Sequence, residues 1–128
     1  MSSNGLLMGV IAFAVAFFLM RQAQSSDGID VKEASQMSQS GALLLDVREP
    51  GEYASGHAPN AVLIPLGQLG SRMQEIAAYK DKPVAVMCRS GRRSASATKQ
   101  LAEAGFSQVK NVNGGIMAWE QAGLPVVR

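Results

Sequence analysis

The stretch Val84–Ser94 reads VAVMCRSGRRS, and it decides the fold because it joins a strand pattern to a loop and a helix pattern. Its first four residues form an apolar run of strand length. After the loop, Ala97, Leu101 and Ala104 recur at the three- and four-residue steps of one helix face. A strand followed by a short loop and a helix is the building unit of α/β domains.

The same alternation of strand and helix patterns continues on both sides of this stretch. Further apolar runs of strand length lie at residues 43–47 and 61–64. A weaker strand pattern lies at residues 109–112, and residues 29–31 are expected to form a short fifth strand. Helical spacing occurs at residues 66–76 and 116–122. Continuous apolar runs are typical of strands that are covered on both faces. The sequence therefore predicts one α/β domain with a mostly parallel sheet over residues 29–128.

Cys88 is the only cysteine, and it stands at the carboxyl end of the predicted strand, where ligands bind in open parallel sheets. Amides of a tight loop, the start of a helix and nearby arginines all favour a thiolate, the reactive form of cysteine. Gly91 allows the loop a positive φ that brings its amides close. The pattern predicts a nucleophile; an inert core cysteine is the alternative interpretation.

The loop around Cys88 is also rich in cations, since Arg89, Arg92 and Arg93 all lie in it. A guanidinium binds oxyanions through a planar fork of donors, so the loop predicts an anionic substrate. The alternative is a solvated basic corner without a ligand. One cysteine excludes an intramolecular disulfide and multi-cysteine metal sites. The net charge of +2 is too small to indicate nucleic-acid binding.

The N-terminal region differs in composition from the rest of the 128 residues. Residues 6–20 read LLMGVIAFAVAFFLM and carry no charged side chain. As a helix, the first twenty residues would reach roughly 30 Å, about one hydrocarbon core of a bilayer. We assign residues 1–23 to a hydrophobic membrane-anchor or signal segment, residues 24–28 to a linker and residues 29–128 to the α/β domain.

Three interpretations of this N-terminal segment remain open: a retained anchor helix, a cleaved signal peptide and a buried core helix. A signal peptide normally opens with Lys or Arg, and residues 1–4 contain neither. Arg21 follows the apolar span, which by the positive-inside rule favours a cytoplasmic domain. We expect a single-pass anchor in the cell inner membrane with the domain in the cytoplasm; a periplasmic domain after signal cleavage is the alternative.

Three motifs, in order, resemble the rhodanese domain family, and the resemblance covers residues 29–128. The first is DVREPGEY at residues 46–53, followed by GHAPNA at 56–61 and IP at 64–65. The second is the loop CRSGRR at residues 88–93. The third is NGGIMAW at residues 113–119, followed by GLPV at 123–126. Together they form a strong signal, although each alone is weak.

This resemblance implies a doubly wound α/β domain with a five-stranded, mostly parallel sheet flanked by helices, and thiosulfate sulfurtransferase activity without metal or cofactor. Cys88 would take the outer sulfur of thiosulfate, release sulfite and pass the sulfur from a persulfide to cyanide or a thiol. The residues implied to bind the anionic sulfur donor are Arg89, Ser90, Gly91, Arg92 and Arg93. Those implied to support the site are Asp46 and Arg48.

Two other functions compete with sulfur transfer. One is a small cysteine phosphatase or arsenate reductase, since rhodanese-like folds host both; the other is a non-catalytic sulfur-carrier or binding module. Cysteine phosphatases place an arginine six residues after the cysteine, whereas here Ser94 holds that position and Arg93 comes one residue earlier. The shorter loop favours a sulfur atom over a phosphate ester.

Five residues have structural interpretations. Asp46 ends a strand and is expected to brace the site through hydrogen bonds. Arg48 and Glu52 are four residues apart and opposite in charge, so we expect them to pair. His57, the only histidine, is expected to pack in a loop rather than to act as a base for the cysteine. Trp119 is expected in the core.

Overall fold

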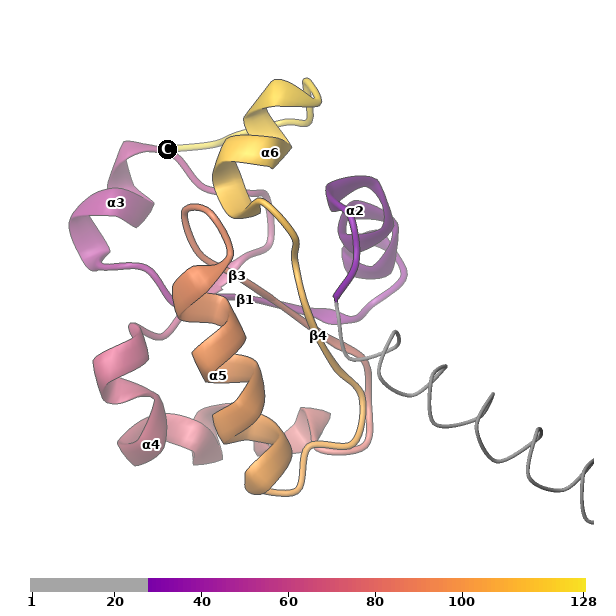
Figure 1. Ribbon diagram of the computed structural model, residues 1–128, viewed down its shortest axis with the longest axis vertical. Helices are drawn as coiled ribbons and strands as arrows, with labels where there is room; N and C mark the ends of the chain where they lie inside the picture. Colours follow the sequence, from indigo (N-terminus) through magenta and orange to yellow (C-terminus); the bar gives the residue numbers. More distant parts are fainter. Residues whose placement is uncertain (1–27) are drawn as a thin grey trace, which may run out of the picture.

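The computed structural model describes residues 28–128, which form a parallel sheet with helices on both faces (Figure 1). The strands are β1 (Leu43–Asp46), β2 (Val62–Leu63), β3 (Val84–Met87) and β4 (Val109–Asn111). The α-helices are α2 (Val31–Gln39), α3 (Pro50–Ser55), α4 (Leu69–Arg72), α5 (Arg92–Glu103) and α6 (Gly115–Gln121). Two 3₁₀ segments, η1 (Leu66–Gln68) and η2 (Met73–Tyr79), flank α4.

The strands of the described residues are arranged in the order β2-β1-β3-β4, and every pair of neighbours is parallel. In this order β1 and β3 are central, with Asp46 level with Met87. Cys88 follows Met87 directly, so it leaves the sheet at the carboxyl edge, where the sequence predicts a ligand site.

Apart from Asp46 at the end of β1, the central strands are apolar because each contributes to two cores. Leu43 and Leu45 of β1, with Val84 and Val86 of β3, pack into one cluster beneath α4, η2 and α5. The intervening residues pack into a second cluster with α2 and α6. This alternation is the physical reason for the continuous apolar runs.

The predicted fifth strand at residues 29–31 is wrong. Ile29 makes only an isolated parallel bridge with Val112. The next residue, Asp30, caps α2: its side chain accepts a 2.8 Å hydrogen bond from the amide of Glu33. The chain therefore turns into a helix at Val31 before a strand can extend, and the sheet has four strands within the described residues.

The predicted hydrophobic helix within residues 1–23 lies outside the described residues, and so does most of the predicted linker. Among residues 28–128, no helix has both the length and the apolar character needed to cross a bilayer.

Candidate active site

The sulfur of Cys88 lies in a loop that β3 and α5 hold from two sides. The loop spans three residues between Cys88 and the start of α5 at Arg92. Gly91 precedes the helix with a φ of +111°, which a residue with a side chain adopts only with strain. Cys88 is 1% exposed, so the sulfur's partners within the described residues are protein groups of this loop and its neighbours.

Hydrogen-bond donors converge on this buried sulfur. The amide of Gly91 donates to Sγ over 3.1 Å, and the hydroxyl of Ser94 lies 3.3 Å away. Burial by itself raises the pKa of the Cys88 thiol, but the Ser94 hydroxyl and the amides of Ser94, Gly91 and Ser90 outweigh it and lower the pKa below its usual value. The loop therefore favours a thiolate, as the sequence predicts.

The first turn of α6 closes the loop from the other side. The amide of Ile116 donates to the carbonyl of Cys88 over 2.9 Å, and the amide of Met117 donates to the carbonyl of Arg89 over 3.1 Å. Gly115 makes this approach possible, since a Cβ at this position would lie 2.3 Å from the carbonyl oxygen of Cys88.

Replacing Gly115 by alanine is therefore expected to destabilise the protein by about 3 kcal/mol or more, because overpacking adds to the strain of a φ of +52°. Denaturant unfolding measures the loss. Gly123→Ala is the matched control: its φ is +74°, but no atom lies within 4 Å of the added Cβ. Equal losses in the two variants would contradict the close contact between α6 and the loop.

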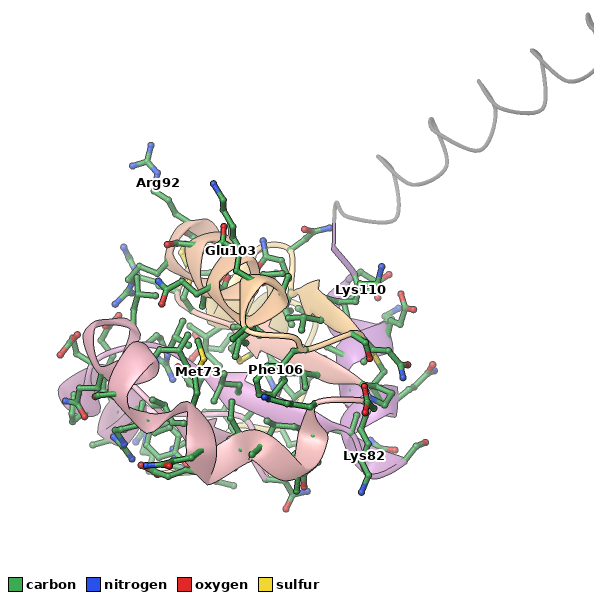
Figure 2. All side chains as sticks on the ribbon, turned by 90° about the horizontal axis from the view of Figure 1, so that it is seen from below. Met73, Lys82, Arg92, Glu103, Phe106 and Lys110 are labelled. Atoms are coloured by element: carbon green, nitrogen blue, oxygen red, sulfur yellow. The ribbon has the colours of Figure 1, made fainter. Side chains whose placement is uncertain are left out.

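The three arginines of the loop have different surroundings. Arg93 donates to both carboxylate oxygens of Glu52 in α3, over 2.6 and 2.8 Å. Arg89 and Arg92 are exposed, and their side chains form no hydrogen bond or ion pair within residues 28–128. Figure 2 shows Arg92 projecting away from the body of the molecule. Two guanidiniums are thus free to bind an anion, while the third already has a carboxylate partner.

The ion pair of Glu52 with Arg93 predicts a pH dependence of stability. The hydrogen bond from Arg93 holds the pKa of Glu52 at about 2, below its usual value of 4.5. Because the folded pKa is the lower one, the stabilisation is complete above the unfolded value and is lost as the pH falls from 4.5 towards 2.

Glu52→Gln is expected to lower the free energy of unfolding at neutral pH by about 1 kcal/mol, since about a third of each side chain is exposed. The difference from the wild type should shrink across that acid window in denaturant titrations. Glu75→Gln, which breaks the surface pair with Arg72, is the control and should change stability less. A Glu52→Gln effect that stays constant with pH would contradict this assignment.

Arg48 pairs with Asp46 rather than with the carboxylate of Glu52, which corrects the predicted pairing. The guanidinium contacts the Asp46 carboxylate through Nε and through Nη2, the latter over 2.8 Å, and both side chains are almost fully buried. Arg48 also donates to the carbonyls of Glu52 and Gly56. The pair thus ties α3, which carries the Arg93 partner, to the end of β1.

His57 and Trp119 have the predicted structural roles. The His57 ring stacks on Tyr53 with 3.7 Å between ring centroids, and its Nδ1 lies 2.9 Å from the Tyr53 carbonyl. Trp119 is 2% exposed and donates to the carbonyl of Pro125. Across residues 28–128, no three His, Cys, Asp or Glu side chains are grouped so that they could hold a metal ion.

Two residues near the sulfur were not predicted as parts of the site. Ser94, completely buried in the first turn of α5, contacts the sulfur directly. Asn111, the last residue of β4, accepts a short hydrogen bond from the Ser94 hydroxyl and donates to the carbonyl of Gly91. Ser94 stands six residues after Cys88, a visible signal, but Asn111 reaches the site only through the order of the strands.

The chain belongs to the rhodanese-like domain family, whose family model matches residues 30–122. A sulfurtransferase of Allochromatium vinosum is 45% identical over 85 residues, which cover 66% of this chain and 78% of that protein. The thiosulfate sulfurtransferase GlpE of Vibrio cholerae is 38% identical over 99 residues, which cover 77% of this chain and 92% of that protein. Homology to these proteins supports a sulfurtransferase activity in general.

A solved structure agrees with this assignment. A rhodanese-related protein from Thermoplasma volcanium superposes with a TM-score of 0.71 at 34% identity. The superposition covers 79% of this chain and 97% of that chain. The four-stranded parallel sheet with helices on both faces is therefore a rhodanese-like fold.

Proposed function

We propose that the protein is a thiosulfate sulfurtransferase that works through a persulfide on Cys88. The observation that carries the proposal is the set of hydrogen-bond donors on Sγ, from the Gly91 amide and the neighbouring loop amides. These donors stabilise a negative sulfur in a buried place, and the same charge is present on the thiolate and on the persulfide. The relatives with sulfurtransferase names support the same activity.

The reaction divides into two displacements, each of which conserves charge. The Cys88 thiolate attacks the outer sulfur of thiosulfate; a new S–S bond forms, and the old one breaks with its electron pair leaving on sulfite. The product is a Cys88 persulfide anion. Cyanide or a thiolate then attacks the terminal sulfur and forms thiocyanate or a new persulfide. The S–S bond to Cys88 breaks, and its electron pair restores the Cys88 thiolate.

In this proposal the loop binds the donor through both its amides and its arginines. The amide of Gly91 donates to the reacting sulfur, and the amide of Ser90 helps to lower the pKa of the Cys88 thiol. Arg89 and Arg92 have free guanidiniums for the sulfonate oxygens of thiosulfate, and Arg93 serves the same anion while it shares its donors with Glu52.

Asp46 and Arg48 have a supporting role. Their buried pair holds α3 through two backbone carbonyls, and α3 in turn presents Glu52 to Arg93. The position of the loop around Cys88 thus depends on the Asp46–Arg48 pair, which acts on it through α3 and Glu52.

Arg92→Ala is expected to raise the KM for thiosulfate about tenfold with little effect on unfolding, because the side chain is exposed and charge-assisted hydrogen bonds are strong. Arg93→Ala should raise the KM and also lower stability, since it breaks the Glu52 pair. Steady-state kinetics alongside denaturant unfolding separate the two effects. Unchanged kinetics in both variants would remove the arginines from the proposed binding site.

The experiment that tests the proposed function compares donors. We expect thiocyanate from thiosulfate and cyanide, and no phosphate release from a panel of phosphomonoesters. Robust phosphate release that depends on Cys88 would instead show a phosphatase. Neither product, with Cys88 still able to take up sulfur, would show a sulfur-carrier module.

We also propose that residues 1–23 anchor the domain to the cell inner membrane with the domain in the cytoplasm. The support is the uncharged, apolar run at residues 6–20 and the single Arg21 after it. Membrane fractionation with protease protection of the domain tests this. A processed protein in the periplasm would show a cleaved signal peptide instead.

A further inference from the structure

A chain of hydrogen bonds runs from β4 to the sulfur, and its direction follows from the groups involved. Asn111 Nδ2 donates to the carbonyl of Gly91 over 3.2 Å. A carbonyl only accepts, so the amide group of Asn111 is oriented with its oxygen towards Ser94. The contact between Ser94 Oγ and Asn111 Oδ1 then needs a hydrogen, and only the Ser94 hydroxyl has one.

The single hydroxyl hydrogen of Ser94 is therefore used when Cys88 is a thiol. Its oxygen lies 3.3 Å from Sγ, and the hydrogen in that contact comes from the thiol. When the thiol loses its proton, two lone pairs would face each other across the same contact. The Ser94 hydroxyl must then rotate away from Asn111 and donate to the sulfur.

We propose that Ser94 and Asn111 are positioning residues that set the reactivity of Cys88, because the thiolate and Asn111 compete for the one hydroxyl hydrogen of Ser94. The inference rests on the proposed function, in which Cys88 is the nucleophile. Ser94 stabilises the negative sulfur by turning towards it. Asn111 opposes this by offering another acceptor, so it holds back the thiolate.

Burial of both side chains increases the effect of this competition on the thiolate. Ser94 is completely buried and Cys88 is 1% exposed. The backbone of Ser94 is fixed as well, because Thr98 Oγ1 donates to its carbonyl over 2.7 Å. With the backbone held, rotation about the Cβ–Oγ bond alone redirects the hydroxyl hydrogen from Asn111 to the sulfur.

The charged side chains near the sulfur do not account for the expected effect of Ser94 and Asn111 on the Cys88 thiolate. Arg93 of α5 acts on Cys88 electrostatically, but it is paired with Glu52 of α3. On the neighbouring strand β1, Asp46 is paired with Arg48. α6 contacts the loop through backbone amides, and β4 contributes the uncharged Asn111. Within residues 28–128, Ser94 is therefore the side-chain donor next to the sulfur.

The test is a pH titration of the thiolate by its ultraviolet absorbance in the full chain, with Cys88→Ser as the blank. Since Cys88 is the only cysteine, the signal belongs to one atom. Ser94→Ala is expected to move the transition to higher pH, with about a tenfold smaller thiolate population at a given pH. Asn111→Ala is expected to move it to lower pH, because Ser94 then donates to the sulfur without competition.

The double variant Ser94→Ala/Asn111→Ala separates this inference from a structural role. Asn111 acts through Ser94, so the double variant should titrate like Ser94→Ala alone. Ser96→Ala and Asn113→Ala are the matched controls, since both side chains are exposed, and they should titrate like the wild type.

A shift of Asn111→Ala to higher pH would overturn the inference, because it would show that Asn111 only holds the loop in place. If Asn111→Ala fails to fold, Asn111→Asp takes its place: a carboxylate accepts more strongly and adds negative charge, so the transition should move to higher pH. An unchanged or lower transition in Asn111→Asp would also overturn it. The titration needs no sulfur donor, so a protein that titrates as expected but takes no sulfur from thiosulfate refutes only the proposed function.

Discussion

Replacing Cys88 by serine is expected to lower the rate of thiocyanate formation by at least about a thousandfold. The reason is that a buried serine hydroxyl does not ionise near neutral pH, so no nucleophile forms, although the oxygen still accepts from the Gly91 amide. The rate is measured with thiosulfate and cyanide.

The matched control for this variant is Ser96→Ala, an exposed substitution in the same helix, which should keep wild-type activity. The Cys88→Ser protein should unfold at nearly the wild-type denaturant concentration, because serine fits the same space. A folded Cys88→Ser protein with substantial activity would contradict the mechanism.

Replacing Arg48 by methionine is expected to cost about 3–5 kcal/mol of unfolding free energy. Asp46 is completely buried, so loss of its partner leaves a carboxylate without compensation, and two backbone carbonyls also lose their donor. Denaturant unfolding of the full chain measures the change.

Arg72→Met provides the comparison, because it removes the same kind of side chain from an exposed ion pair with Glu75. That variant should unfold almost like the wild type. An Arg48→Met protein that loses no more stability than Arg72→Met would show that the buried pair is not a tie between β1 and α3.

Much of the fold could be predicted because the spacing of apolar residues in the sequence indicates its strands and helices. The apolar runs at β1 and β3 mark strands covered on both faces, and Ala97 and Leu101 mark the buried face of α5. The helix expected over residues 66–76 is instead broken into η1, α4 and η2. Gly67 and Gly70 lower helix propensity in this segment, and Ile76 has a non-helical φ of −117°.

Only those residues of the site that lie close together in the sequence could be predicted. The strand end, Cys88 and Gly91 lie within a few residues of one another, so the loop was visible in the sequence. The partners that set its electrostatics come from elsewhere: Glu52 is 41 residues from Arg93, and Asn111 is 17 residues from Ser94. Such contacts depend on the order of strands and the packing of helices, which local patterns do not encode.

The most direct test of the central claim is the intact mass of the protein after incubation with thiosulfate. We predict an added mass of about 32 Da, one sulfur atom held as a persulfide, which disappears when cyanide is added and never forms in Cys88→Ser. An unchanged mass in the wild-type protein, or the same adduct in Cys88→Ser, would contradict a persulfide on this cysteine.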